Sequence, residues 1–271
     1  MVLAGRVAHG LLEPVSTSDH AIVRDQRLVV DGTTIGHFHR YEAEPPSAEL
    51  FEPSVPVSGA AVAILHELAG WNFTTTDDAL ASELMGKGAV STRHYSLLTL
   101  DLAIAAVPEL RPGWSDAFEL VTPTPEMKIS PELVTLVRRA YPPGHPDQEL
   151  GSDDEIVGDL SRALNGVRLG QLMPQSRLVV DAGRPVALAL VNRVPGSAPT
   201  GGPWLTDICR DPDAKYAGLG RALLTHLLRA CRDDGELSIS LAVTQGNSAR
   251  RLYDDAGFTL VATTRKMHLP G

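Results

Sequence analysis

The sequence predicts an α/β fold in which a glycine-containing turn joins a strand to a helix. Trp204–Arg210 alternates between apolar and polar residues and lies between prolines, which indicates a strand. After the turn, leucines between 219 and 228 recur at helical spacing, which predicts a helix. Leu237–Val243 is then the next apolar run. The order strand, turn, helix, strand organises the C-terminal half.

The turn carries Gly218 and Gly220 at the start of the predicted helix. The first N–H groups of a helix have no partners within the helix and lie at its positive end, so this position suits a pyrophosphate. Glycine leaves the approach clear. A dinucleotide fold needs a third glycine, and a Walker loop needs Gly-Lys-Ser/Thr, so neither fits.

Two motifs in the expected order carry a family resemblance. Lys215-x-x-Gly218-x-Gly220 is followed by Asn247-x-x-Ala-x-x-Leu252-Tyr253-x-x-x-Gly257-Phe258. Together they resemble the acetyl-CoA-binding core of the GNAT N-acetyltransferase superfamily. The family usually has Arg or Gln where this chain has Lys215. The resemblance implies a mixed, mostly antiparallel sheet flanked by helices.

The resemblance also implies a donor and a set of binding residues. Acetyl-CoA is the expected acyl donor, and no metal site is predicted. Backbone N–H groups near the end of the central strand would meet the acetyl carbonyl, and the loop would hold the pyrophosphate. The residues expected to bind acetyl-CoA are Ile208, Cys209, Arg210, Lys215, Tyr216, Ala217, Gly218, Leu219, Gly220, Arg221 and Asn247.

Tyr253 is the expected general acid, because a phenol is protonated at neutral pH and can donate to a departing thiolate. The base is less evident. Where some family members carry glutamate, this chain has Trp204 and Ala242. Asp207 is the candidate, acting directly or through water, although a structural aspartate is the alternative. Cys209 has no evident activating base, which favours direct attack by the acceptor amine.

The first part of the chain repeats features of the last part. Arg27-Leu-Val-Val-Asp31 recurs as Arg177-Leu-Val-Val-Asp181, and each run precedes a glycine-containing turn and a second apolar segment. Two similar hairpins are therefore predicted. The alternative is a chance match between common strand residues.

A late helix also occurs in both parts. Asp77–Gly88 is predicted to lead into a strand pair over Val90–Leu102, as Ser248–Gly257 leads into a pair over Phe258–Leu269. The order of elements thus repeats.

The first copy lacks the phosphate-binding turn. Its predicted helix, Ala60–Leu68, follows Pro56-Val-Ser-Gly59 rather than a Gly-x-Gly loop. We therefore expect residues 1–112 to form a smaller, degenerate, non-catalytic acetyltransferase-like domain, and residues 116–271 to form the GNAT domain. Pro108–Trp114 marks the expected boundary, because its prolines and glycine interrupt helix and strand.

The start of the second domain supplies candidate acceptor contacts. Ile129–Arg139 has helical spacing with Ser130 as the expected N-cap. Candidates in the following loop and helix start are His145, Asp147, Asp153, Asp154 and Glu155. Solvated charge is the alternative for each. Pro195–Pro203 is the loop expected to move.

Composition limits the partners. A net charge of −9 and a pI near 5.4 argue against a nucleic-acid or anionic-membrane surface. The two cysteines give no disulfide framework, and no signal peptide or spanning segment is evident. A cytoplasmic location is the expectation.

Three functional hypotheses remain from the sequence. The leading one is transfer of an acetyl group from acetyl-CoA to a primary amine of a small molecule or peptide. The second is a non-catalytic acyl-CoA-binding pseudoenzyme or sensor, and the third is an interaction protein. The sequence identifies neither the acceptor nor the oligomeric state.

Overall fold

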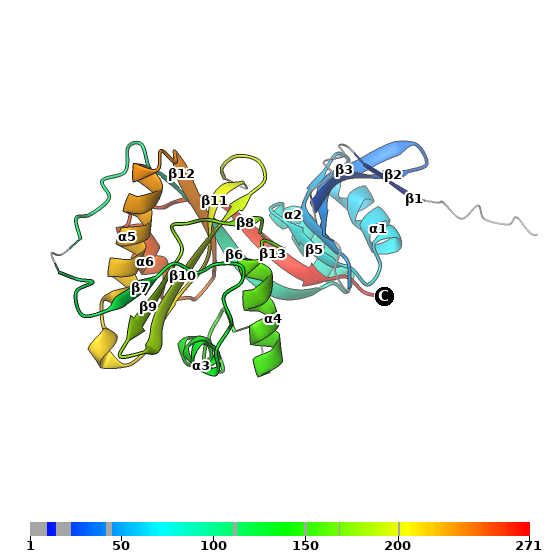
Figure 1. Cartoon of the computed structure of the whole chain (residues 1–271). Coiled ribbons are helices and arrows are strands. Elements are labelled where there is room, and N and C mark those ends of the chain that lie inside the picture. The colour runs from blue at the N-terminus through cyan, green and yellow to red at the C-terminus, as the bar shows by residue number, and fades with distance from the viewer. Residues whose placement is uncertain are drawn as a thin grey trace, which may run out of the picture. The chain divides into compact units, whose positions relative to one another are not determined.

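The computed structural model describes residues 10–14, 23–41, 45–110, 113–148, 151–167, 169–199 and 201–271. It divides into two compact units (Figure 1), Met1–Tyr95 with Ala262–Gly271 and Ser96–Val261. The division therefore falls inside a strand rather than in the predicted boundary segment 108–114, of which Arg111 and Pro112 lie outside the described residues.

Among its described residues, the first unit contains one sheet with two helices. Its sheet order is β1-β2-β3-β4-β5-β13, in which β13 is Thr259–His268. β4 and β5 run parallel, and the other neighbours run antiparallel. Its elements are β1 (Gly10–Pro14), β2 (Val23–Val30), β3 (Thr33–Tyr41), β4 (Ser47–Pro53), α1 (Val57–Glu67), β5 (Asn72–Thr75) and α2 (Asp78–Gly86).

The second unit contains a sheet with the order β6-β12-β11-β10-β9-β7, in which β6 is Val90–Asp101, and β8 also pairs with β10. Of these strands, β11 and β12 run parallel. Its elements are β7 (Glu119–Val121), α3 (Pro131–Ala140), α4 (Asp153–Leu164), β8 (Gln171–Leu172), β9 (Arg177–Asp181), β10 (Arg184–Val194), β11 (Gly202–Arg210), η1 (Ala214–Tyr216), α5 (Leu219–Asp233), β12 (Ser238–Thr244) and α6 (Arg250–Asp255). The predicted mixed, mostly antiparallel sheet flanked by helices is confirmed.

Two long strands, β6 (Val90–Asp101) and β13 (Thr259–His268), contribute residues to both units. Both regions were expected to be strand pairs, and both are single strands. The end of β6 lies beside β12, where the Ser240 hydroxyl donates to Thr99 Oγ1 at 3.1 Å. The end of β13 pairs with β5. Thus β6, which follows the late helix of the first half, ends in the sheet of the second unit. In the same way, β13 follows the late helix of the second half and ends in the sheet of the first unit.

Both predicted hairpins are present. β2 and β3 are joined through Asp31 and Gly32, and β9 and β10 through Ala182 and Gly183. All four turn residues have positive φ, as the two-residue turns that match strand twist require. The five-residue match is offset by one, because Asp31 is a turn residue whereas Asp181 ends its strand.

The second unit has three layers (Figure 1), because β10 presents alternate side chains to two helical layers. Ala187, Ala189 and Val191 lie in the cluster formed with α5. Leu188 and Leu190 lie in the cluster formed with α3 and α4. The central sheet is therefore buried on both faces.

The first unit has its own core of aromatic side chains. The ring of Phe51 lies 5.8 Å from that of Phe38 and 5.3 Å from that of Phe73. Gly36 is required here, since a Cβ at this position would lie 2.3 Å from the Phe51 ring. Helix α1 begins at Val57, three residues before the predicted start, with Pro56 as its N-cap.

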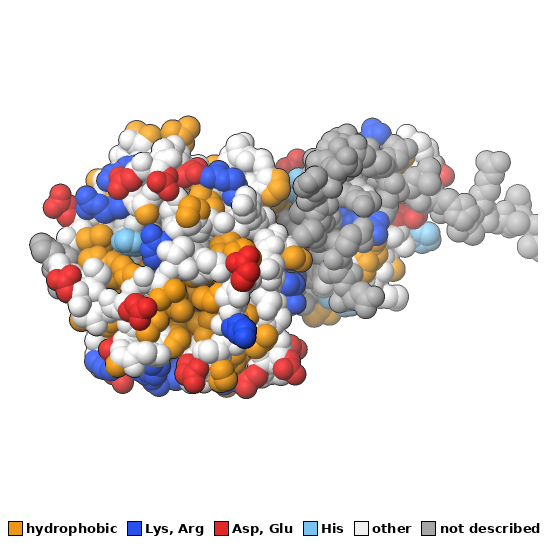
Figure 2. All heavy atoms as spheres, in the orientation of Figure 1, with side chains coloured by type: hydrophobic (Ala, Val, Ile, Leu, Met, Phe, Trp, Pro, Cys, Tyr) orange, Lys and Arg blue, Asp and Glu red, His pale blue; other side chains and the backbone are white. Residues whose placement is uncertain are grey.

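On the face of the second unit visible in Figure 2, acidic and basic side chains are interspersed, with hydrophobic side chains gathered between them. Among the described residues, no helix is both long and apolar enough to cross a bilayer.

Candidate functional site

The glycine-containing turn lies between β11 and α5, as predicted. Gly218 has a φ of 85°, a conformation that side-chain-bearing residues rarely adopt. A Cβ added at Gly218 would meet no atom within 4 Å, and at Gly220 the nearest atom would be Arg210 Cδ at 3.9 Å. Packing of the described protein atoms therefore does not demand glycine at position 220. The open space at the helix start is a cradle that side chains would fill, and it fits a pyrophosphate group.

The start of α5 directs unpaired N–H groups toward this space. Ala222 N is the first to bond back, to Gly218 O at 3.1 Å. The N–H groups of Leu219, Gly220 and Arg221 precede it and have no partner within the helix. Because the helix dipole is also positive at this end, the turn favours an anion.

A buried carboxylate, Asp211, holds the beginning of the turn. It is only 1% exposed, and it accepts the N–H of Asp213 at 2.9 Å. Arg139 of α3 and Arg184 of β10 form ion pairs with it at 2.9 and 3.3 Å. Two arginines and a backbone donor thus satisfy a carboxylate that would be costly to bury alone. The sequence gives no signal for this role of Asp211, since an Asp-Pro pair also fits an ordinary turn.

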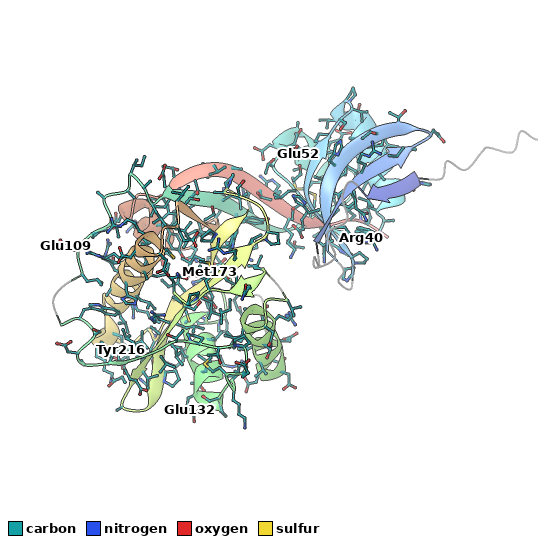
Figure 3. The ribbon with its side chains drawn as sticks, turned by 45° about the horizontal axis from the view of Figure 1, so that its top comes forward. Arg40, Glu52, Glu109, Glu132, Met173 and Tyr216 are labelled. Carbon is teal, nitrogen blue, oxygen red and sulfur yellow. The ribbon has the colours of Figure 1, made fainter. Side chains whose placement is uncertain are left out.

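Two predicted binding residues direct their side chains elsewhere. Tyr216, labelled in Figure 3, is 3% exposed, and its hydroxyl donates to Asp181 at 2.7 Å. Lys215 Nζ donates to the same carboxylate at 3.1 Å. Bonds from Tyr216 and Lys215 lower the pKa of Asp181. Any contact of Tyr216 with a ligand at the turn therefore falls to its backbone.

The strands β11 and β12 pair at one position in the described register, Trp204 with Ser240. Beyond this pair, the N–H of Asp211 shows which way the N–H groups at the end of β11 point. It donates to Val186 O on β10 at 2.8 Å. Successive N–H groups of a strand point to opposite edges. The N–H groups of Ile208 and Arg210 therefore point to the β12 edge, as an acyl carbonyl would need, whereas that of Cys209 points to β10.

Asp207 and Tyr253 belong to one part-buried cluster with a third residue, Tyr141, for which the sequence carries no signal. The Tyr141 hydroxyl donates to Asp207 Oδ1 at 2.5 Å. Burial raises the pKa of Tyr141, and the charge of Asp207 adds to this effect. Burial also raises the pKa of Tyr253, followed by the charges of Asp207 and Asp147. Tyr253 is thus held in the protonated form that an acid requires.

The packing of Tyr253 also fits a structural role. Its ring meets the edge of Phe258, with centroids 5.8 Å apart, and the residue is 6% exposed. The ring therefore anchors α6 while the hydroxyl lies in the electrostatic field of Asp207.

Cys209 lies beside this cluster as a buried thiol. Burial raises its pKa well above the usual value, and the Asp207 charge acts in the same direction. A thiol held protonated is a poor nucleophile. The structure therefore provides no activated cysteine at this position.

Asn247 lies beside Asp147 and His145, two of the candidates for contact with the acceptor substrate. The Asn247 side chain accepts the Ala249 N–H at 2.8 Å through Oδ1 and donates through Nδ2 to Asp147. Asp147 N in turn bonds to His145 Nδ1 at 3.1 Å. Because Nδ1 accepts this hydrogen bond, neutral His145 carries its proton on Nε2. The Nε2 atom therefore cannot accept a proton without a change of tautomer.

The remaining acidic candidates lie at the start of α4, where two of them have structural partners. Glu155 accepts N–H groups of Gly151 and Ser152, which completes a capping box and lowers the pKa of Glu155. Asp153 forms an ion pair with Arg138. These contacts favour the helix-start interpretation for both residues.

The fold of the chain is similar to that of solved acetyltransferase structures. A GCN5-related N-acetyltransferase from Sphaerobacter thermophilus aligns with a TM-score of 0.58 at 15% identity, covering 91% of this chain and 81% of that one. A GNAT-family acetyltransferase from Colwellia psychrerythraea gives 0.54 at 11% identity, with 94% and 91% covered. These similarities establish the fold.

A tandem GNAT protein from the clavulanic acid biosynthesis pathway also aligns, with a TM-score of 0.52 at 17% identity over 90% of this chain and 82% of that one. A first half derived from an acetyltransferase fold is consistent with this similarity. No curated protein matches the chain.

The fold and the turn define a GNAT-type acyltransferase architecture. Residues 131–258 match the model of the acetyltransferase (GNAT) family. The chain therefore contains a GNAT acetyltransferase domain over these residues.

Proposed function

We propose that the protein transfers an acetyl group from acetyl-CoA to a primary amine on a small molecule or peptide. The observation that carries the proposal is the convergence of two features at the end of β11. The open helix start at Gly220 follows this strand, and the Asp207–Tyr141 pair with Tyr253 lies at it. The open helix start suits a phosphorylated thioester, and the Asp207–Tyr141 pair with Tyr253 suits proton transfer beside that thioester.

In this proposal, the chain holds the donor mainly through backbone groups. The N–H groups at the start of α5 bind the pyrophosphate, and those of Ile208 and Arg210 face the acyl carbonyl. When bound, acetyl-CoA supplies an activated acyl thioester. Its acyl group is held near a carboxylate and a phenol rather than near an activated thiol.

Tyr253 then gives a proton to the leaving sulfur, which its raised pKa supports because the phenol remains protonated. Asp207 takes a proton from the acceptor amine, directly or through water. Tyr141 fixes the orientation of Asp207 by donating to Oδ1. The amine attacks directly, because Cys209 is buried and protonated.

The test is a screen of small amines and peptides with acetyl-CoA, in which released CoA thiol is followed and acetylated product is identified by mass spectrometry. We expect at least one amine to give stoichiometric thiol and amide, and Tyr253→Phe to slow this reaction. Tight acetyl-CoA binding without acetylated product from any amine would favour the sensor hypothesis instead. Absence of acetyl-CoA binding would contradict both.

A further inference from the structure

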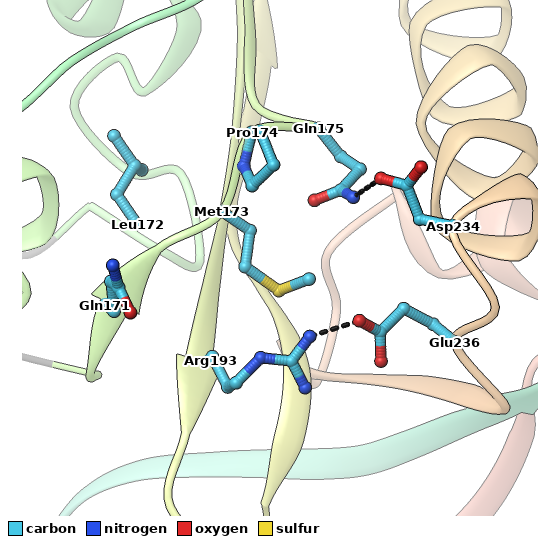
Figure 4. A pocket seen from close by; sticks show the side chains of 8 residues that line it. All are labelled: Gln171, Leu172, Met173, Pro174, Gln175, Arg193, Asp234 and Glu236. Carbon is cyan, nitrogen blue, oxygen red and sulfur yellow. Dashed lines mark hydrogen bonds and ion pairs between the residues drawn. The ribbon is translucent and has the colours of Figure 1, made fainter.

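A pocket lies in the second unit, away from the glycine turn, where α5 ends (Figure 4). Its volume is about 260 Å³, below the roughly 300–1,000 Å³ of sites for drug-sized ligands. It is lined by Gln171, Leu172, Met173, Pro174, Gln175, Arg193, Asp234 and Glu236. A ligand here would be small.

The C-terminus of α5 places two carboxylates at this pocket. Gly235 has a φ of 84° and donates to Arg232 O at 2.9 Å, while Glu236 N donates to Cys231 O at 3.0 Å. This glycine-dependent helix ending reverses the chain between Asp234 and Glu236, and both line the pocket. The negative end of the helix dipole adds to their charge.

Gln175 supplies the observation that points to a ligand. It is 3% exposed, and its Nε2 donates to Asp234. Its Oε1 is buried and has no hydrogen-bond partner among the described residues. Figure 4 shows this oxygen on the pocket side of the amide, turned away from Asp234. A buried acceptor without a donor is costly, and a ligand N–H group would satisfy it.

The other polar groups define the charge of that ligand. Arg193 forms an ion pair with Glu236, which leaves the Asp234 carboxylate as the excess charge. Figure 4 shows the Met173 thioether between this ion pair and the Gln175–Asp234 pair. Together with Leu172 and Pro174, it gives an apolar wall. The pocket thus combines an acidic, acceptor-rich side with a short hydrophobic surface.

We propose that this pocket is a second ligand site, separate from the acyl-transfer region, and that it takes a small aliphatic amine in its ammonium form. The ammonium donates to Gln175 Oε1 and lies near Asp234, while the alkyl chain packs on Met173. The site is independent of the proposed transferase function, because it shares no residue with the glycine turn or the Tyr253 cluster.

The test uses the full chain labelled with ¹³C at its methionine methyl groups. The sequence contains five methionines, and Met173→Leu assigns the pocket resonance. We expect n-propylammonium to shift the Met173 methyl signal saturably, and propionate at the same ionic strength to leave it unchanged. Gln175→Leu should weaken propylammonium binding about tenfold or more, because a hydrogen bond between a buried acceptor and a charged donor is lost.

Gln171→Leu is the matched control, since Gln171 lines the same pocket but is exposed. We expect it to change affinity less than about twofold, as surface substitutions usually do. Asp234→Asn keeps the shape and removes the charge, so it tests the proposal even if Gln175→Leu fails to fold, and it should also weaken binding. An unshifted Met173 signal, an equal response to propionate, or unchanged affinity in folded Gln175→Leu or in Asp234→Asn would overturn the proposal.

Discussion

Each unit contains a parallel strand pair, and the two pairs differ in the contacts made beyond the last paired residue. In each, the strand after the hairpin contains one extra residue relative to its antiparallel neighbour, in β4 near Leu50 and in β11 at Thr206. Each of these strands also has a short described parallel register, two pairs for β4 with β5 and one for β11 with β12. The similarity of these details supports a common design.

The difference lies in the residues beyond the last parallel pair. In the first unit, Thr74 Oγ1 accepts the Leu50 N–H at 2.7 Å and donates to Glu49 at 2.7 Å. Thr75 Oγ1 donates to Phe51 O at 2.8 Å. These hydroxyls join the two strands through side chains.

In the second unit, the residues after the last pair on β12 are Leu241 and Ala242, whose side chains cannot accept a backbone N–H. Hydroxyl side chains thus join β4 to β5, and Leu241 and Ala242 of β12 cannot make the same contact with β11. We expect the N–H groups at the end of β11 to bind a ligand and the first unit to have no equivalent site.

The largest difference between the two units is expected for substitutions in the first turns of α5 and α1. Gly220→Glu should abolish acetyl-CoA binding, because its side chain fills the space beside the free N–H groups and brings negative charge to a phosphate site. Glutamate near a helix start is otherwise favourable, so folding should persist. Isothermal titration calorimetry measures the affinity.

Gly59→Glu is the matched control in the first unit, since Gly59 lies in the first turn of α1 and an added Cβ meets no atom within 4 Å. We expect one acetyl-CoA per chain for wild type and for Gly59→Glu. Two sites per chain, or full affinity in folded Gly220→Glu, would contradict the asymmetry between the units.

The second prediction concerns Tyr253. Tyr253→Phe keeps the ring contact with Phe258 and removes the proton donor, so kcat should fall by about 10²–10⁴-fold with acetyl-CoA affinity preserved. Because burial and nearby carboxylates raise the pKa of Tyr253, its acid form persists as pH rises. Wild-type kcat should therefore show no alkaline decline from this group up to about pH 10. If the variant retained the wild-type kcat, Tyr253 would have a packing role only.

A smaller effect is expected at Tyr141, the positioning residue for Asp207. Tyr141→Phe should lower kcat about tenfold through loss of a charge-assisted hydrogen bond, with little change in KM for acetyl-CoA. Tyr95→Phe is the control, because Tyr95 is also a part-buried tyrosine near a carboxylate, Glu49, but in the first unit. Steady-state kinetics on both variants should separate them. An equal loss in both would indicate a general stability effect.

The smallest effect on activity is predicted for the threonine contact of the first unit. Thr74→Val is close to isosteric and leaves the Leu50 N–H without its acceptor, so the free energy of unfolding should fall by about 1–3 kcal/mol. Urea denaturation measures the change, and acetyl-CoA stoichiometry should stay at its wild-type value. A variant as stable as wild type would show that Thr74 does not hold the two strands together.

The sequence predicted the elements whose signals are local. The hairpins after Arg27 and Arg177, the N-cap at Ser130 and the turn at Gly218 all depend on residues close together in the chain, and all are present. The late helices were found for the same reason, although their boundaries shifted by a few residues.

Contacts that join distant segments were not predictable in this way. Tyr141 meets Asp207 across 66 positions, and Asp211 meets arginines from two other elements. No spacing rule connects such residues. For the same reason, the long strands β6 and β13 were expected to turn back within their own halves, since short connections are the usual case.

The placement of β13 has a consequence for synthesis on the ribosome. The C-terminal part of β13, Arg265–His268, pairs with β5 of the first unit, although it follows the whole second unit in the chain. A nascent first half therefore presents β5 with one edge unpaired, a state prone to association with other strands. We therefore expect the first unit to complete its sheet only after the acetyltransferase half has been translated.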